Sequence, residues 1–236
     1  MFSKDYTTPA VILMTKIPQA GESKTRLCPP LTASGAAELA ECFLRDTILH
    51  VEQTGIEMWL AVTPYSSFDE LEFMVHKPAH IFMQEGCNLG SRMNHALRTV
   101  MKNDKRSVVL IGSDLPTMPA LYVTTAIEVL EEDEADVVFT PTRDGGFGLV
   151  AMRKPIPALM ECVEWSTATT LLQVLARARV LELRYLLLTE WYDIDTVADL
   201  AELSSELTTN ASTRAQAPNT WKWVEQYANC YRHSNP

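Results

Sequence analysis

Two kinds of hydrophobic pattern alternate along this chain, and together they predict an α/β fold. Short apolar runs with no polar face, as at 11–14 and 107–112, are typical of strands that are buried on both sides. Longer segments place apolar residues three or four positions apart, as at 90–103, which is typical of amphipathic helices. By the same patterns we expect further strands at 56–63, 79–83, 136–140, 147–152 and 184–188, and further helices at 32–53, 66–75, 116–133, 167–182 and 196–207.

Most of these elements alternate as strand and helix, which predicts a three-layer αβα domain with a mixed, mostly parallel sheet. The exception is the pair of strands around Asp144-Gly145-Gly146, because two strands joined by a glycine-rich turn are typical of an antiparallel hairpin. We assign 1–207 to this domain and 208–236 to a linker and a C-terminal helix. The linker is predicted from the polar composition of 208–219, and the aromatic helix at 220–231 should pack on the domain or on a partner chain of a homodimer.

The composition narrows the class of protein. With 236 residues, 47% of them hydrophobic, the chain can form a substantial core, and its formal net charge of −10 argues against nucleic-acid binding. The apolar runs are shorter than the roughly 18 residues of a membrane-spanning helix, and the first residues lack a hydrophobic signal segment. The five cysteines are odd in number and form no CxxC pair, which favours reduced thiols. We therefore expect a cytoplasmic protein without a membrane span.

A basic loop follows the first predicted strand. Lys16 ends the strand, Pro18 and Gly21 force a loop, and Lys24 and Arg26 follow. Because ligands of open α/β sheets bind beyond the carboxyl ends of the strands, this loop is a candidate site for a polyphosphate. The alternative is a solvated loop whose cations only aid solubility. Removing either Lys24 or Arg26 should hardly change stability, because both side chains are expected to be exposed.

This basic loop is not one of the common glycine-rich phosphate loops. The segment Gly21-Glu22-Ser23-Lys24-Thr25 resembles the end of a P-loop, but Ser23 and Pro18 stand where that motif needs glycines. No GxGxxG follows a predicted strand, so the usual dinucleotide fingerprint is excluded as well. Phosphate would have to be held mainly by side chains.

A second candidate is Asp114, in the segment Gly112-Ser113-Asp114-Leu115-Pro116 that follows the clearest buried strand. A carboxylate there lies in the same predicted crevice as the basic loop. Mg²⁺ and Mn²⁺ prefer carboxylate oxygens and typically combine one or two of them with substrate phosphates. The alternative is that Asp114 caps the helix predicted to begin near Pro116.

Three later features are weaker candidates. Asp193 and Asp195 follow the last predicted strand, where one of them could bind a metal and Asp195 or Thr196 could instead cap the next helix. The turn at 144–146 lets the backbone approach a ligand, or is simply a tight turn. Arg92, in the first turn of a predicted helix, could bind an anion or be an ordinary surface residue.

Taken together and in order, these segments resemble those of a bacterial GT-A-like glycosyltransferase family. That family is associated with radical-SAM and selenium-domain proteins and is related to the nucleotide-diphospho-sugar transferases. The resemblance covers nearly the whole chain and is carried by Lys-x-Pro-x-x-Gly-x-x-Lys-Thr-Arg-Leu at 16–27, Gly-Ser-Asp-x-Pro at 112–116, Asp-Gly-Gly-Phe at 144–147, Trp-Ser-Thr at 165–167, Asp-Ile-Asp-Thr at 193–196 and the tail at 220–223.

The resemblance implies a metal-dependent transferase of the GT-A fold that takes a nucleotide-sugar or a nucleoside triphosphate and a small-molecule acceptor. It implies catalytic roles for Asp114, Lys24 and Arg26, nucleotide or phosphate binding by Lys16, Gly21, Lys24, Thr25, Arg26, Arg92 and Ser113, a substrate loop at Asp144, Gly145 and Gly146, and a Mg²⁺ or Mn²⁺ ion at Asp114 and Asp195.

One departure from the usual pattern keeps the reaction open. Gly112 stands where the Asp-x-Asp motif of many GT-A enzymes has its first aspartate. A lone aspartate before Leu-Pro is more similar to guanylyltransferases that activate a small phosphorylated substrate. Glycosyl transfer is the first hypothesis, nucleotidyl transfer is the second, and a non-catalytic nucleotide-binding protein is the third.

Overall fold

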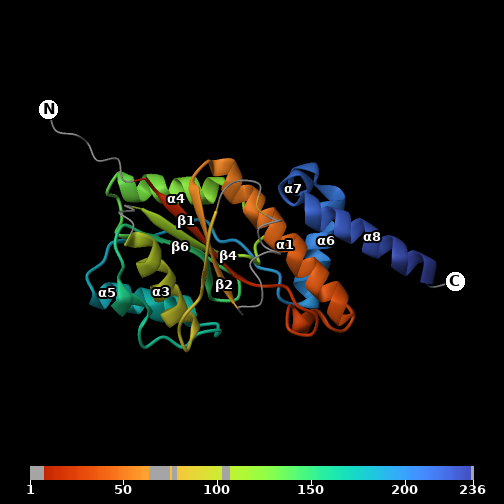
Figure 1. The fold of residues 1–236 in the computed structure, drawn as a ribbon, viewed down its shortest axis with the longest axis horizontal. Coiled ribbons are helices and arrows are strands. Elements are labelled where there is room, and N and C mark those ends of the chain that lie inside the picture. The colour runs from red at the N-terminus through yellow and green to blue at the C-terminus, as the bar shows by residue number, and fades with distance from the viewer. Residues whose placement is uncertain (1–7, 64–74, 76–78, 103–106, 235–236) are drawn as a thin grey trace.

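In the described part of the chain, seven strands form one sheet through the middle of the protein, with helices on both faces (Figure 1). The structure, a computed structural model, describes residues 8–63, 75, 79–102 and 107–234, with 228–234 described by their backbone only. The strands lie in the order β3-β2-β1-β4-β6-β5-β7. Their bounds are β1 (Ala10–Lys16), β2 (Glu57–Thr63), β3 (His80–Met83), β4 (Val108–Gly112), β5 (Val137–Pro141), β6 (Phe147–Met152) and β7 (Tyr185–Leu187).

The predicted mixed, mostly parallel sheet is confirmed. Neighbouring strands are parallel except where β6 runs antiparallel between β4 and β5. The hairpin expected around Asp144-Gly145-Gly146 is therefore the connection between β5 and β6. The helix predicted at 66–75 falls almost entirely outside the described residues.

Helices form the two outer layers (Figure 1). The helices α1 (Ala33–Thr54) and α4 (Leu121–Glu131) cover one face, and α3 (Leu89–Met101) and α5 (Thr170–Val180) cover the other. The α4 helix is shorter than the pattern at 116–133 predicted. Among the described residues, no helix combines the length and the apolar character that crossing a membrane requires.

The alternation of side chains along β1 explains the two core layers. Val11 and Leu13 are fully buried in the cluster under α1 and α4, whereas Ile12 and Met14 belong to the cluster under α3 and α5. Successive residues of a strand point to opposite faces, so a strand buried on both faces must be apolar throughout. This is why β1 appears in the sequence as a continuous apolar run.

The pairing of β1 with β4 creates the crevice that the sequence predicted. From β1 the chain moves outward to β2 and β3, and then returns to the opposite side of β1 as β4. The two strands are parallel, with Met14 opposite Gly112, so the loops that follow them leave the same edge of the sheet. A reversal of strand order of this kind opens a binding crevice at the carboxyl ends.

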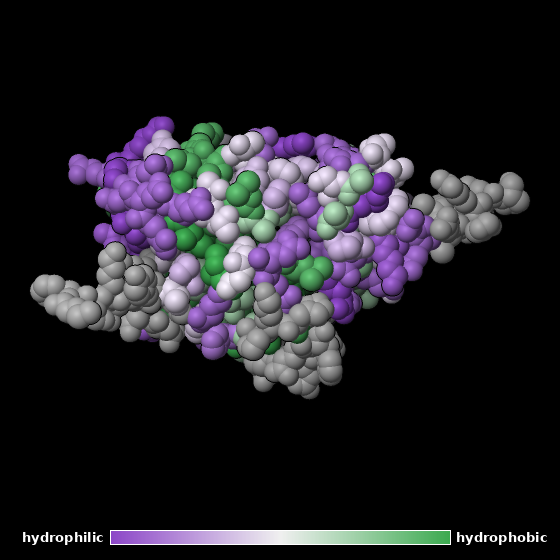
Figure 2. All heavy atoms as spheres, turned by 90° about the horizontal axis from the view of Figure 1, so that it is seen from above, coloured by the Kyte–Doolittle hydropathy of each residue, from purple (hydrophilic) through white to green (hydrophobic). Residues whose placement is uncertain are grey.

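The C-terminal segment is helical and not a linker at 208–219. It is formed by α6 (Val197–Thr209), α7 (Ala211–Gln216) and α8 (Pro218–Ser234), which continue to the right of α1 in Figure 1. A third hydrophobic cluster holds these helices together, since Phe43 of α1, Leu203 of α6 and Trp223 of α8 are all buried in it. Polar composition misled the prediction because these helices bury one apolar side in this cluster, while the surface visible near the C-terminal end is mainly hydrophilic (Figure 2).

A buried carboxylate of α1 anchors α8. Asp46 is fully buried. Its Oδ1 accepts hydrogen bonds from the Asn219 backbone N–H (2.9 Å) and Nδ2 (2.7 Å), and its Oδ2 accepts from the Thr220 backbone N–H (2.9 Å) and Oγ1 (2.6 Å). Because the first amides of a helix have no intrahelical acceptor, Asp46 caps α8 from another helix.

Replacing Asp46 by alanine is expected to lower the free energy of unfolding by about 2–4 kcal/mol, because four donors lose their acceptor at a buried site. Urea denaturation measures the change. The control is Glu38→Ala, which removes an exposed carboxylate from the same helix and should cost less than about 0.5 kcal/mol. Equal losses in the two variants would show that the Asp46 cap does not hold α8.

Candidate active site

A cavity of about 730 Å³ opens at the edge of the sheet where β1 and β4 end. Its lining comes from the end of β1, the basic loop, the start of α3, the segment after β4, the turn between β5 and β6, the segment before α5, and the segment before α6. The sequence-predicted residues among its lining are Lys16, Lys24, Thr25, Arg26, Arg92, Ser113, Asp114, Asp144, Gly146 and Asp195. Gly21 and Gly145 are not lining residues.

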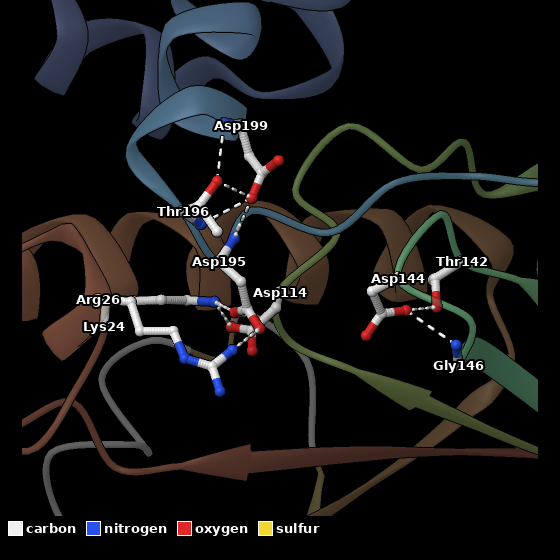
Figure 3. Close-up of polar contacts among 9 residues, drawn as sticks. All are labelled: Lys24, Arg26, Asp114, Thr142, Asp144, Gly146, Asp195, Thr196 and Asp199. Carbon is white, nitrogen blue, oxygen red and sulfur yellow. Dashed lines mark hydrogen bonds and ion pairs between the residues drawn. The ribbon is translucent and has the colours of Figure 1, made fainter. Parts of the chain in front are cut away.

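Lys24 is the central residue of the candidate site (Figure 3). Its Nζ lies 2.8 Å from Asp195 Oδ1 and 3.0 Å from Asp114 Oδ1, and its side chain is only 7% exposed. Burial alone would lower the pKa of Lys24, but the two carboxylates outweigh burial and raise the pKa. Lys24 therefore carries its positive charge at neutral pH. The expectation of an exposed side chain is wrong for Lys24.

Local structure fixes Lys24 in this position. Lys24 adopts a left-handed backbone conformation (φ 48°) at the start of the single turn Thr25–Leu27. The Leu27 N–H donates to the Lys24 carbonyl (2.9 Å), and the Leu27 side chain is fully buried in the cluster beneath the loop. The buried Leu27 pins the turn, so the lysine side chain is directed toward the cavity.

The other cations of the cavity are less constrained. Arg26 is 73% exposed, and its Nη1 lies 3.6 Å from Asp195 Oδ2. Lys16 pairs with Glu22 (Nζ to Oε2, 3.1 Å), and Arg92 Nε donates to the carbonyl of Gly86 (3.2 Å). Exposed pairs of this kind contribute little stability, so these side chains are available to a ligand.

Neither candidate carboxylate caps a helix. α4 begins at Leu121 with Ala120 in the capping position, so the alternative that Asp114 is a cap is wrong. Thr196 caps α6 and forms a capping box with Asp199, which leaves the Asp195 side chain to Lys24. The structure thus separates roles that the sequence left open.

A backbone contact joins the two segments that carry these carboxylates. The Ile194 N–H donates to the carbonyl of Asp114 at 3.2 Å. The segment after β4 and the segment before α6 therefore lie side by side, although 80 positions separate Asp114 from Ile194 in the sequence. This contact brings Asp195 to the end of β4.

The turn at 144–146 forms a separate part of the cavity. Asp144 Oδ1 accepts from Thr142 Oγ1 (2.6 Å) and from the Gly146 N–H (2.9 Å) (Figure 3). Gly145 has φ +88°, and a Cβ there would lie 2.0 Å from the carbonyl oxygen of Ala168. Gly145 is thus required because the turn packs directly against the segment before α5.

Two further lining residues had a lesser place in the sequence analysis: Asp193 was an alternative to Asp195 as a metal ligand, and Trp165 entered only through the family resemblance. Asp193 lines the cavity, and burial, followed by the charges of Asp144 and Asp195, raises its pKa to about 6. Trp165 packs so closely on α3 that a Cβ at Gly90 would lie 2.5 Å from its ring. In the sequence, the signal for Asp193 was its position two residues before Asp195, and the signal for the packing of Trp165 was Gly90 in the first turn of α3.

The donor set fits a hard divalent cation that takes part of its ligands from a substrate. Asp114 and Asp195 supply carboxylate oxygens, and their side chains are 47% and 39% exposed. The described residues contain no group of three or more side chains that could hold a metal ion on their own. Mg²⁺ commonly binds through one or two carboxylates together with substrate phosphates and water.

Comparisons with known proteins agree with this architecture. A family model described as "Uncharacterized protein conserved in bacteria (DUF2064)" matches residues 47–167, a span that includes Asp114 and Asp144. No curated protein matches the sequence significantly. A solved structure from Desulfovibrio desulfuricans G20, provisionally named a nucleotide-diphospho-sugar transferase, is 26% identical, with a TM-score of 0.81 over 93% of this chain and 97% of that chain.

Two more distant structures share the fold alone. A cytidylyltransferase from Leptospira borgpetersenii is 11% identical, with a TM-score of 0.57 over 95% of this chain and 96% of that chain. A CMP:2-keto-3-deoxy-manno-octonic acid synthetase, solved with CTP, is 12% identical, with a TM-score of 0.55 over 85% of this chain and 98% of that chain. The chain therefore has the fold of nucleotide-diphospho-sugar transferases and related nucleotidyltransferases.

Replacing Lys24 by methionine is expected to lower the free energy of unfolding by about 1–3 kcal/mol, because Asp114 and Asp195 lose the buried charge between them. Methionine keeps the apolar stem of the side chain. The matched variant Arg26→Met removes an exposed cation two residues away and should cost less than about 0.5 kcal/mol. Thermal and urea denaturation without added nucleotide measure both, and similar losses would contradict the central position of Lys24.

Proposed function

This chain belongs to the bacterial protein family DUF2064, and we propose that it is a transferase that binds a nucleotide-diphospho-sugar and passes the glycosyl group to a small-molecule acceptor. The observation that carries the proposal is the buried Lys24 between Asp114 and Asp195, at the crevice where β1 and β4 end. The fold and the 26% identity to a protein provisionally named a nucleotide-diphospho-sugar transferase support it.

In this proposal the basic loop stabilises the leaving diphosphate. When the bond between the anomeric carbon and the diphosphate breaks, negative charge develops on the phosphate oxygens. Lys24 and Arg26 supply fixed positive charge there, with Lys16 nearby at the end of β1. Donors that are already oriented stabilise such charge more than water does, because they need no reorganisation. Thr25, Ser113 and Arg92 complete the proposed phosphate site.

Asp114 and Asp195 would hold a Mg²⁺ or Mn²⁺ ion. When bound, such an ion would supply Lewis-acid stabilisation of the charge on the leaving diphosphate. The two carboxylates also position Lys24 through their contacts of 3.0 and 2.8 Å. A ligand that displaces Lys24 from one carboxylate would leave the lysine free to contact a phosphate oxygen.

Nucleotidyl transfer is the second candidate function. It is favoured by Gly112, which leaves Asp114 without the first aspartate of an Asp-x-Asp pair. In that reaction pyrophosphate would leave the α-phosphorus of a nucleoside triphosphate, and the same cations would stabilise it. A non-catalytic nucleotide-binding protein would bind a nucleotide without turnover, and an activity assay separates it from both enzymes.

Several finer features belong to the same proposal. We propose that 1–207 is the nucleotide-binding domain and that the C-terminal segment 208–236 packs on it or on a partner chain of a homodimer. We also propose that the protein works in the cytoplasm. The association with radical-SAM and selenium-domain proteins, implied by the family resemblance, also stays a prediction.

The proposed metal role of Asp114 can be tested by calorimetric titration of UDP, CDP, GDP and ADP with and without Mg²⁺. In the unmodified protein, Mg²⁺ should strengthen binding of the preferred nucleotide about tenfold or more. The phosphates supply oxygen ligands to the ion, and the ion supplies positive charge that stabilises the bound phosphates. Asp114→Asn keeps the size of the side chain but removes its charge, and should abolish this enhancement. The control Glu202→Gln removes an exposed carboxylate outside the cavity and should keep it. An undiminished enhancement in Asp114→Asn would exclude Asp114 from the metal site.

A further inference from the structure

The basic residues that line the cavity all come from one part of the chain. The described lining includes four lysines and arginines, which all precede Asp114 in the sequence: Lys16, Lys24, Arg26 and Arg92. Beyond Asp114 the lining brings carboxylates, hydroxyls and two aromatic rings, but no lysine or arginine among the described residues. We call the part formed by 142–148 and 165–170 the distal wall.

Asp144 gives the distal wall a fixed negative charge. Its Oδ1 is occupied by Thr142 and by the Gly146 N–H, and in Figure 3 the residue lies apart from the cluster around Lys24. The adjacent Arg143 does not neutralise it. Arg143 Nη1 pairs with Glu202 Oε1 (2.8 Å), and its guanidinium lies 4.7 Å from the centre of the Tyr192 ring. Asp144 therefore lacks a basic partner of its own among the described residues.

Rigid aromatic rings and hydroxyl groups complete the distal wall. Trp165 and Phe147 lie edge to face with ring centroids 6.3 Å apart. The close packing of Trp165 on Gly90 leaves the indole no room to shift toward α3. Ser166 and Thr167 are exposed beside it and line the cavity. An aromatic face with hydroxyls and a carboxylate acceptor suits a hydroxylated ring of a ligand. The C–H groups of such a ligand can pack on the aromatic side chain, and its O–H groups can donate to Asp144.

We infer that the distal wall receives an uncharged, hydroxyl-bearing group and discriminates against a group that carries a carboxylate or phosphate at that place. The inference rests on the proposed function, because the nucleotide diphosphate must occupy the basic end of the cavity. An anion at the distal wall would be repelled by Asp144 and by Asp193, because both carboxylates line the same cavity. Arg92 belongs to α3, which packs on Trp165 of this wall through Gly90, and its Nε donates to the carbonyl of Gly86.

The test compares the neutral-sugar and uronate conjugates of whichever nucleoside diphosphate binds, for example UDP-glucose with UDP-glucuronate or GDP-mannose with GDP-mannuronate. The two members of a pair differ at C6, where the neutral sugar has a hydroxymethyl group and the uronate has a carboxylate. Calorimetry at low salt, about 50 mM, keeps the repulsion unscreened over several ångströms. In the unmodified protein the neutral sugar should bind about tenfold or more tightly than its uronate. Asp144→Asn should narrow the difference to about threefold or less, because it removes the negative charge. The amide oxygen can still accept from Thr142 and Gly146, so the turn should be retained. The control Asp133→Asn removes an equal charge outside the cavity and should leave the ratio unchanged.

The outcomes separate this inference from the proposed function. If a nucleoside diphosphate binds but its neutral sugar and its uronate bind equally, or if Asp144→Asn leaves their ratio unchanged, the inference is overturned and nucleotide binding stands. If the uronate binds more tightly than the neutral sugar and this preference is lost in Arg92→Gln, the inference is also overturned. The carboxylate of the uronate is then assigned to Arg92. If none of the four nucleoside diphosphates binds, the proposed function fails, and the inference fails with it.

Discussion

The parallel pairing of β1 with β4 is the constraint on which the candidate site depends. With Met14 opposite Gly112, the basic loop and the Asp114 segment must leave the sheet at one edge. Both faces of β1 are buried, so a shift in this pairing would require both close-packed core layers to repack. The two core clusters thus position the loops that line the crevice without lining it themselves for the most part.

Charge is the second organising principle of the site. The chain carries a formal net charge of −10, yet it buries the ammonium group of Lys24. Such burial is costly unless the charge is paired, and two partly exposed carboxylates supply the pairing. The same carboxylates fit a divalent cation. Lys24 and a metal ion that carries the diphosphate would therefore share the carboxylates of Asp114 and Asp195. Ligand binding would then replace some contacts of Lys24 with these carboxylates by contacts with the phosphates.

The sequence allowed prediction of the features that depend on short-range pattern. The apolar runs at β1 and β4, the hairpin around Asp144 and the position of Asp114 after β4 are all readable from neighbouring residues. The burial of Lys24 is not readable in this way, because its partner Asp195 lies 171 positions away in the sequence. A lysine in a basic loop looks the same whether it is solvated or paired.

Other errors have a similar cause. The segment at 208–219 looked like a linker because it has few apolar residues, and the contact of Ala217 with the cluster around α1 depends on tertiary packing. The acceptor that caps α8 is also distant in sequence, since it is Asp46 of α1. The sequence did not place Trp165 and Asp193 in one cavity wall, because membership of such a wall depends on which loops meet after folding. Capping roles were ambiguous for Asp195 and Thr196 because both types of residue accept hydrogen bonds from helix amides.

The long separation of Lys24 from its two partners has a consequence for how the protein is made. A chain growing on the ribosome completes β1 and the basic loop early, but Asp114 emerges much later and Asp195 later still. Until then Lys24 has neither of the counter-charges that make its burial favourable, and the loop stays open to solvent. The crevice therefore matures late, because it needs the closure of two long loops that local sequence cannot hasten. A fragment that ends before Asp195 would carry the sheet edge but not the finished site.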